Sequence, residues 1–200
     1  MITLKQTAEI LAATPEMLQH IENCGRTCYK SHDKITDGSA ERFIGMLIRR
    51  GHESVLEHGS ITVKLITNRA IANELVRHRI ASYSQESTRY CTYRNEVAFI
   101  KPEFKNKAAE GIWLNHCRHS EWDYKLMLEN GEAPETARDI LPLCLATEIV
   151  VTANIREWRN ILKQRTAAAA HPQIRELMGK VLDLFLKDYA VLFSDIREAE

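Results

Sequence analysis

Residues 60–67 have the sequence SITVKLIT, in which Ile61, Val63 and Leu65 alternate with other residues. This period of two predicts a half-buried β-strand with one face on the core. A similar alternation predicts a strand over residues 2–10, and apolar or β-branched stretches predict shorter strands at 97–100 and 147–152. Few, alternating strands favour a mainly antiparallel sheet over a parallel wound sheet, whose strands are continuous apolar runs.

Helical spacing of apolar residues fills most of the remaining chain. One helix is expected to begin at Pro15, with Thr14 as its cap, and another to run from Ser39 to just before Gly51. Further helices are predicted at residues 68–79, 106–128, 134–141, 155–164 and 172–196. No Gly-, Ser- or Pro-rich linker divides the chain, so we predict an α+β fold with a single domain over residues 1–200, in which helices pack a small sheet.

The composition excludes several classes of protein. The chain has 27 Lys and Arg against 27 Asp and Glu, and 44% of its residues are hydrophobic. This argues against a disordered chain and against non-specific nucleic-acid binding. No apolar run is long enough to span a bilayer, and the first residues lack a signal-peptide pattern. Five cysteines without framework spacing predict reduced thiols in a cytoplasmic protein.

The densest polar segment is RHRIASYSQESTRY at residues 77–90. Arginines beside hydroxyl groups suit the recognition of phosphate or carboxylate, because guanidinium gives bidentate, permanently charged hydrogen bonds. A solvated helix end, stabilised through the helix dipole and followed by a polar loop, explains the same residues equally well. Chemistry alone leaves both interpretations open.

Two histidine clusters resemble metal sites only superficially. His52 and His58 are six residues apart, whereas a zinc-binding helix needs two histidines four apart. The cluster at residues 116–119 has no second ligand pair. We therefore expect no metal.

A second polar stretch begins at Asn154, which is predicted to cap the helix that follows. Arg156 and Asn160 are four residues apart on one face of that helix, with Gln164 near the same line. An exposed polar face is the alternative explanation for this stripe.

The segment at residues 77–89 resembles the signature of the flavin-dependent thymidylate synthases, Arg-His-Arg-x-x-Ser-x-Asn-x-x-Ser-x-Arg. One position departs from it, since Ser84 stands where the family usually has Asn. Further blocks similar to those of the family occur in the same order at residues 26–29, 51–58, 138–142, 154–160, 165 and 171–173, so the resemblance spans most of the chain.

The resemblance implies methylation of dUMP at C5 to give dTMP. Methylenetetrahydrofolate would supply the carbon, NADPH the reducing equivalents, and FAD the hydride. It further implies homotetramers whose active sites lie at subunit interfaces.

The resemblance also implies a role for each matched residue. The FAD contacts would be Ser54, Glu57, Arg77, His78, Arg79, Gln85, Asn154, Arg156 and Asn160. The nucleotide contacts would be Glu74, Arg77, Gln85, Glu86, Ser87, Thr88, Arg89, Arg138 and Arg165. Arg165 would be catalytic by stabilising negative charge on the uracil ring. His52 would lie in the folate or reductant region, and Glu74 stands where some members have Gln.

No residue is expected to act as a covalent nucleophile. Ser87 lies in the nucleotide segment, but a serine without an activating base is a poor nucleophile. Cys91 lies nearby without a base in any motif. We therefore expect direct hydride delivery to the uracil ring. A non-catalytic nucleotide- or RNA-binding module and a zinc hydrolase are the weaker alternatives.

Overall fold

The computed structural model describes residues 1–197, which group into two compact units. Unit 1 comprises Met1–Thr7, Leu65–Leu75 and Ser84–Ile149. Unit 2 comprises Ala8–Lys64, Val76–Tyr83 and the described residues from 150 onward.

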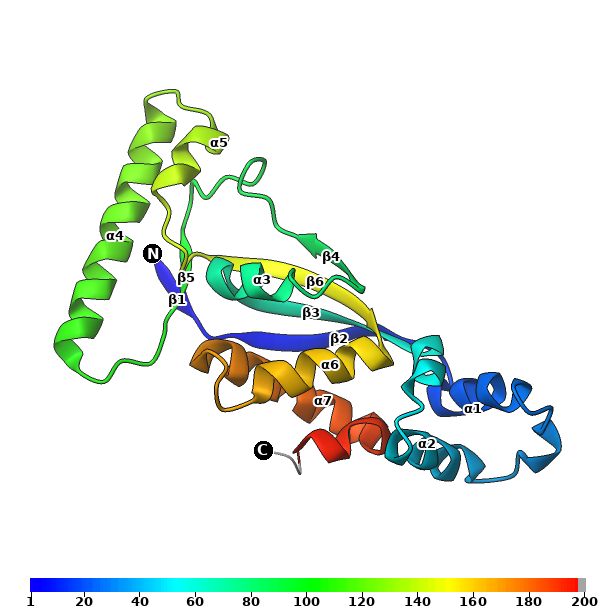
Figure 1. Ribbon diagram of the computed structural model, residues 1–200. Coiled ribbons are helices and arrows are strands. Elements are labelled where there is room, and N and C mark those ends of the chain that lie inside the picture. The colour runs from blue at the N-terminus through cyan, green and yellow to red at the C-terminus, as the bar shows by residue number, and fades with distance from the viewer. Residues whose placement is uncertain (198–200) are drawn as a thin grey trace. The chain divides into compact units, whose positions relative to one another are not determined.

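A four-stranded sheet has the strand order β2-β3-β6-β4 (Figure 1). Its strands are, in that order, β2 (Thr7–Ala13), β3 (Ser60–Asn68), β6 (Ala146–Asn154) and β4 (Ala81–Gln85). Ile61, Val63 and Leu65 of β3 are all buried. The predicted α+β fold with a mainly antiparallel sheet is confirmed.

The prediction of one strand over residues 2–10 is wrong. β1 (Ile2–Leu4) pairs in parallel with β5 (Ala98–Ile100), in a two-stranded sheet separate from β2. Between β1 and β2, Gln6 is buried and its Oε1 accepts a hydrogen bond from Thr67 Oγ1 at 2.6 Å. A buried polar side chain requires such a partner, and this position interrupts the simple alternation.

The helices of unit 1 are α3 (Arg69–Leu75), α4 (Lys107–Glu129), α5 (Pro134–Ala137) and the 3₁₀ turn η3 (Arg138–Ile140). The predicted helix over 134–141 is thus a short α-helix continued by a 3₁₀ turn. On α4, Cys117, Tyr124 and Leu128 are buried at helical spacing in a core with Val97 and Phe99. The predicted helix over 106–128 is confirmed.

The predicted helix over residues 68–79 is too long, because α3 ends at Leu75. Within unit 2, the backbone carbonyl of His78 accepts a hydrogen bond from the Tyr83 hydroxyl at 2.7 Å, rather than from a helical N–H group. Arg77 to Arg79 therefore do not form a helix end, and the residues that follow form β4 where a loop was expected.

The helices of unit 2 are α1 (Met17–Thr27), α2 (Ser39–Arg49), α6 (Ile155–Thr166) and α7 (Pro172–Arg197), with 3₁₀ turns η1 (His32–Lys34) and η2 (Glu53–His58). The predicted start of α1 at Pro15 is wrong. Thr14 does not cap it, because Thr14 Oγ1 accepts a hydrogen bond from the backbone N–H of Ser60 at 3.0 Å. Glu16, in a left-handed conformation with φ of 45°, precedes the helix instead.

The core of unit 2 holds α6 in place. Trp158 is buried, packs edge-on against Phe185 of α7 with 5.2 Å between ring centroids, and donates from Nε1 to the carbonyl of Ile61 at 2.9 Å. Burying the aromatic body while satisfying its N–H group stabilises the packing of α6 on β3. α6 and α7 lie side by side (Figure 1).

Across residues 1–197, no helix has both the length and the apolar character that crossing a bilayer requires.

Candidate functional site

The segment that follows α3 brings part of the signature into unit 2. Arg77, Arg79 and Ile80 are exposed, whereas His78 is only 7% exposed. Burial, and to a lesser degree the negative charge of Glu157, raises the pKa of Tyr83 to about 12. The Tyr83 hydroxyl therefore stays protonated, and it donates a hydrogen bond to the backbone carbonyl of His78.

The first turns of α6 supply the polar groups opposite this segment. Asn154 caps the helix as predicted, since its Oδ1 accepts from the backbone N–H of Glu157 at 2.8 Å. Asn160 Nδ2 lies 3.3 Å from both carboxylate oxygens of Glu157, and Gln164 Nε2 donates to Asn160 Oδ1 at 2.7 Å. The predicted polar stripe of α6 is exposed, and two of its members, Asn160 and Gln164, form a chain of hydrogen bonds with Glu157.

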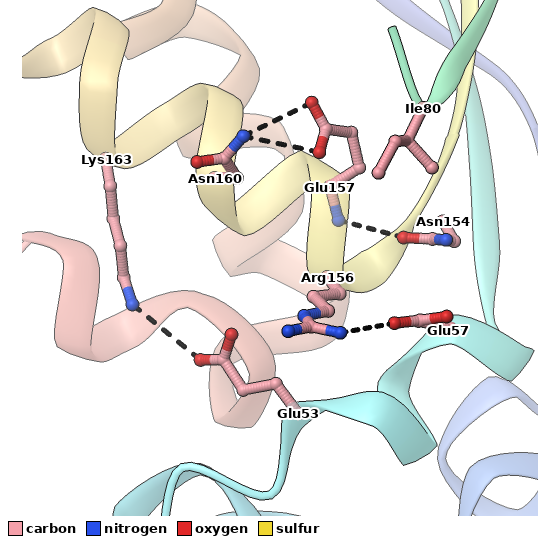
Figure 2. Close-up of a pocket in the computed structure, with 8 residues that line it drawn as sticks. All are labelled: Glu53, Glu57, Ile80, Asn154, Arg156, Glu157, Asn160 and Lys163. Carbon is pink, nitrogen blue, oxygen red and sulfur yellow. Dashed lines mark hydrogen bonds and ion pairs between the residues drawn. The ribbon is translucent and has the colours of Figure 1, made fainter. Parts of the chain in front are cut away.

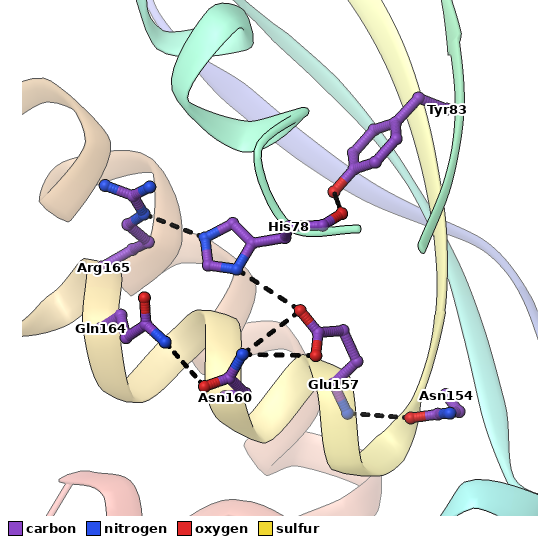
Figure 3. Close-up of polar contacts among 7 residues, drawn as sticks. All are labelled: His78, Tyr83, Asn154, Glu157, Asn160, Gln164 and Arg165. Carbon is purple, nitrogen blue, oxygen red and sulfur yellow. Dashed lines mark hydrogen bonds and ion pairs between the residues drawn. The ribbon is translucent and has the colours of Figure 1, made fainter. Parts of the chain in front are cut away.

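His78 joins this chain to Arg165 (Figure 3). Arg165 Nε donates to His78 Nε2 at 3.0 Å, and His78 Nδ1 lies 3.4 Å from Glu157 Oε1. Burial lowers the pKa of His78, the nearby Arg165 charge lowers it further, and Glu157 opposes both effects. The imidazole is thus held neutral near pH 7, between an arginine and a carboxylate.

A pocket of about 330 Å³ opens beside this cluster. It is lined by Arg77, His78, Arg79, Ile80, Glu157, Asn160, Gln164 and Arg165. Three arginines and two amide side chains around one pocket of unit 2 form a donor set suited to an anionic ligand.

A second pocket of about 510 Å³ shares part of this lining (Figure 2). Its lining residues are Glu53, Glu57, Ile80, Asn154, Arg156, Glu157, Asn160 and Lys163. Arg156 Nη1 donates to Glu57 Oε1 at 2.6 Å, which raises the pKa of Arg156. Ile80, Glu157 and Asn160 line both pockets, and the side chain of Ile80 is 71% exposed.

A buried ion cluster fixes one wall of the second pocket. Arg159 is 1% exposed and donates to both carboxylate oxygens of Asp195, at 2.8 and 2.7 Å, and from Nε to Glu53 Oε1 at 3.2 Å. It also donates to the carbonyl of Leu192. These partners satisfy the buried guanidinium. Arg159 in turn fixes the carboxylate of Glu53, which lines the second pocket.

The rest of the signature lies in unit 1. Gln85 Nε2 donates to Thr147 Oγ1 at 3.2 Å. The backbone N–H of Glu86 donates to the carbonyl of Glu148 at 2.9 Å, and Tyr93 donates its hydroxyl proton to Glu86 Oε1 at 2.7 Å. Burial, followed by this hydrogen bond to Glu86, raises the pKa of Tyr93. The backbone and the side chain of Glu86 therefore both fix the position of the segment that follows β4.

Ser87, Thr88 and Arg89 form a turn near Arg138. Arg138 Nη1 donates to Thr88 Oγ1 at 3.4 Å, and the backbone N–H of Arg89 lies 3.3 Å from Ser87 Oγ. Arg89 Nε donates to Glu135 Oε2 at 2.8 Å, with both side chains about half exposed. Two arginines and two hydroxyls in one part of unit 1 can supply the donors that a phosphate needs.

The site residues predicted from sequence thus fall into two sets. The predicted FAD contacts of unit 2 that line the pockets are Glu57, Arg77, His78, Arg79, Asn154, Arg156 and Asn160. Arg165 lines the smaller pocket with them. Glu74, which lies half-buried in α3, and the residues Gln85, Glu86, Ser87, Thr88, Arg89 and Arg138 belong to unit 1.

Two predicted residues lie apart from the pocket linings. Ser54, in η2, and His52, immediately before it, are exposed and line neither pocket. Glu53, between them, lines the larger pocket instead.

Sequence reasoning missed Glu53, Glu157, Arg159 and Lys163. The spacing Asn154-x-x-Glu157 is the pattern of a helix capping box and could have marked Glu157. No comparable signal marks Arg159, because its partner Asp195 lies far along the chain. Among residues 1–197, no group of three or more His, Cys, Asp or Glu side chains is placed to hold a metal ion.

Comparison with known proteins places the chain in a family. The model of the thymidylate synthase complementing protein family matches residues 9–189. The chain is 34% identical over 169 residues to the flavin-dependent thymidylate synthase of Pyrococcus furiosus, covering 82% of this chain and 69% of that protein. It is 31% identical over 199 residues to the enzyme of that name from Geobacter sulfurreducens, covering 93% and 84% respectively.

A solved structure shares the fold. The UMP/dUMP methylase PolB from Streptomyces cacaoi, in a crystal structure bound with 5-Br dUMP, superposes with a TM-score of 0.83. The superposition covers 97% of this chain and 96% of that one, at 22% sequence identity. The family match and the relatives together show that this chain belongs to the thymidylate synthase complementing protein family.

Proposed function

We propose that this chain is a flavin-dependent thymidylate synthase that methylates dUMP to dTMP. The names of the relatives from Pyrococcus furiosus and Geobacter sulfurreducens support the flavin-dependent reaction, and the neighbour from Streptomyces cacaoi supports a uridylate substrate. The observation that carries the proposal is the pocket of unit 2 in which Arg77, Arg79 and Arg165 surround the neutral His78.

The residues of unit 2 fit FAD by their chemistry. A dinucleotide of this kind has an anionic pyrophosphate and a flat ring with polar edges. Arg77, Arg79 and Arg156 supply permanent positive charge, Asn154 and Asn160 supply amide groups, and the exposed Ile80 offers an apolar surface to both pockets. Volumes of about 330 and 510 Å³ lie in the range of cofactor sites. We also include Ser54 and Gln85 among the proposed FAD contacts, on the basis of the sequence resemblance alone.

The residues of unit 1 fit the phosphate of dUMP. Arg89 and Arg138 would each give charge-assisted hydrogen bonds to phosphate oxygens, with Ser87 and Thr88 as hydroxyl donors. Gln85, Glu86 and Glu74 would contact the remainder of the nucleotide. Because Tyr93 and the backbone of Glu148 fix Glu86, the turn that carries the donors is pre-organised for binding.

Arg165 is the residue that we assign to catalysis. FAD reduced by NADPH would supply the hydride directly to the uracil ring, and methylenetetrahydrofolate would supply the carbon. Arg165 would stabilise the negative charge that develops on the ring, because a permanently charged donor is most effective where water is excluded. His78 is neutral and accepts a hydrogen bond from the Arg165 Nε–H, so it adds no second positive charge beside the uracil ring.

No covalent enzyme nucleophile is needed in this scheme. The hydrogen bonds of Ser87 Oγ and of the exposed Cys91 in unit 1 include none to a general base. A serine or cysteine without such a base is weakly activated.

Further parts of the proposal concern partners and location. We place methylenetetrahydrofolate or NADPH near His52, and infer a homotetramer whose active sites lie at subunit interfaces. All five cysteines are free, which supports a reducing cytoplasmic location. Neither nucleic acid nor membrane is expected as a partner, since the net charge is zero.

The first experiment measures flavin binding. The purified protein should be yellow, or should take up FAD with flavin absorption and quenched fluorescence. Arg156→Ala should weaken that uptake, whereas Arg118→Ala, a control on the exposed face of α4, should leave it unchanged. A folded protein that contains no FAD as purified and takes up none when FAD is added would contradict the proposal.

A further inference from the structure

Glu157 lies at the centre of the polar chain on α6, yet no motif assigns it a role. Both Glu157 and His78 are only 7% exposed, so their polar groups must find partners inside the protein. A buried carboxylate near the N-terminus of a helix is also favoured by the helix dipole. The Glu157 carboxylate is therefore fixed in position, and the hydrogen bonds around it show which nitrogen of His78 carries the proton.

The hydrogen bonds determine where the His78 ring proton lies. The Nε–H of arginine is a donor in every protonation state found in proteins, so Nε2 of His78, 3.0 Å from it, must offer a lone pair. The neutral ring then carries its proton on Nδ1, 3.4 Å from Glu157 Oε1, which can only accept. Arg165, His78 and Glu157 thus form one directed chain (Figure 3).

We propose that Glu157 is a positioning residue for Arg165, which it orients by fixing the tautomer of His78. The proposal rests on the proposed function, because the assignment of Arg165 to the uracil ring gives this orientation its catalytic consequence. Figure 3 shows the two terminal nitrogens of Arg165 pointing away from His78. Holding Nε from behind therefore sets the direction of the groups that would face the substrate.

Removal of the Glu157 acceptor would release this arrangement. The Nδ1–H of His78 would lose its buried acceptor, so only the bond from Arg165 would still favour this tautomer, and the tautomer with its proton on Nε2 would gain population. That proton would meet the Nε–H of Arg165, donor against donor, and the pair would separate. Asn160 and Tyr83 do not supply a substitute acceptor, because Asn160 directs its Nδ2 donor toward the same carboxylate and Tyr83 donates to the His78 backbone carbonyl.

The charges near His78 agree with this assignment. Glu157 is the anionic group that acts on the His78 pKa, and Arg165 is the cationic one. The exposed Arg77 and Arg79 flank the histidine in sequence. Burial and Arg165 outweigh Glu157, so Glu157 directs the proton of a neutral ring instead of charging it.

The test compares Glu157→Ala with Glu157→Gln, whose amide oxygen can still accept from Nδ1. Glu176→Ala, which removes an acid from the exposed Lys180 pair on α7, is the matched control. Histidine labelled with ¹⁵N reports the tautomer, and His78→Gln assigns the signal. The wild type should show a neutral ring protonated on Nδ1 at pH 7.5, and Glu157→Ala should increase the fraction of rings protonated on Nε2. Glu157→Gln should resemble the wild type.

Kinetics provide the second readout. Glu157→Ala should lower kcat for dTMP formation by about 10- to 100-fold, a typical effect of losing a residue that orients a functional side chain. KM for dUMP should change little, because the lost interaction belongs to the transition state. Glu157→Gln should stay within a few-fold of the wild type. Unchanged kcat per folded molecule in Glu157→Ala, or equal loss in both variants, would overturn the proposal.

The two readouts separate this proposal from the proposed function. If the wild type makes no dTMP, the tautomer measurement still tests the role of Glu157. If Glu157→Ala does not fold, the wild-type signal decides: a doubly protonated ring, or one protonated on Nε2, would overturn the proposal.

Discussion

Arg89 donates from its Nε to Glu135 Oε2 over 2.8 Å, so the arginine that we propose for the dUMP phosphate is held by a carboxylate. Both side chains are about half exposed, and such pairs contribute about 0.2–1 kcal/mol. A phosphate must therefore displace Glu135 or share Arg89 with it. Glu135→Gln should tighten the binding of dUMP by about 1.4- to fivefold, which corresponds to that free energy, as measured by calorimetry.

The control for this prediction is Glu132→Gln, which removes the same charge from an exposed position nearby. It should change the dissociation constant by less than Glu135→Gln does. Arg89→Ala should weaken binding and reduce its dependence on salt. Weaker binding of dUMP by Glu135→Gln would contradict the competition between Glu135 and phosphate.

The lowered pKa of His78 gives a dependence of stability on pH. The unfolded chain binds a proton near the ordinary value of 6.5, whereas the folded chain binds it only at lower pH, chiefly because burial disfavours the charged ring. Below 6.5 the unfolded state therefore carries more protons, and the free energy of unfolding falls as the pH drops. His78→Gln should flatten this slope by up to about 1.4 kcal/mol per pH unit.

Urea unfolding between pH 5 and 7.5 measures this difference. His116→Gln, at an exposed position on α4, should keep the wild-type slope. If His78→Gln also keeps it, the folded chain does not hold His78 neutral.

The buried Arg159 cluster should dominate the stability of the C-terminal part of α7. Asp195→Ala removes two hydrogen bonds from a guanidinium that is 1% exposed, and hydrogen bonds to charged groups contribute about 1.5–3 kcal/mol. The melting temperature should fall by roughly 2–4 °C for each kcal/mol lost. Asp183→Ala breaks the exposed Arg197 pair instead and should cost about 1 kcal/mol or less. Equal losses in the two variants, by calorimetry, would contradict the importance of burial.

Ser87→Ala and Cys91→Ser should each retain substantial turnover, because neither residue is activated by a base among its hydrogen bonds. Mass spectrometry of the enzyme quenched during turnover should find no covalent adduct with the nucleotide. Complete loss of turnover in Ser87→Ala, with normal binding of dUMP, would contradict direct hydride delivery.

The parts of the fold that depend on local pattern could be predicted. Asn154 capped the expected helix, and the alternation in residues 60–67 correctly indicated the buried face of β3. β4 was missed because its residues are mostly polar and its place beside β6 depends on pairing with a segment distant in sequence. The helix over 68–79 was overextended because apolar spacing cannot reveal that Tyr83 captures the His78 carbonyl.

The candidate site shows the same limit. Resemblance to a family marked His78 and Arg165, but it did not reveal that Glu157 contacts His78 and is linked through it to Arg165. That connection depends on the fold, which brings a residue after α3 against α6. Arg159 was missed for the same reason, since a buried arginine can be recognised only when its carboxylate partners are in place.

The measurement that tests the central claim most directly is an anaerobic assay of the FAD-loaded protein. The protein is reduced with NADPH, mixed with dUMP and methylenetetrahydrofolate, and followed by flavin absorption and by chromatography of the nucleotides. The account predicts dUMP-dependent reoxidation of the flavin together with formation of dTMP, and a strong loss of dTMP in Arg165→Ala. Folded, FAD-loaded and fully reduced protein that forms no dTMP would contradict it.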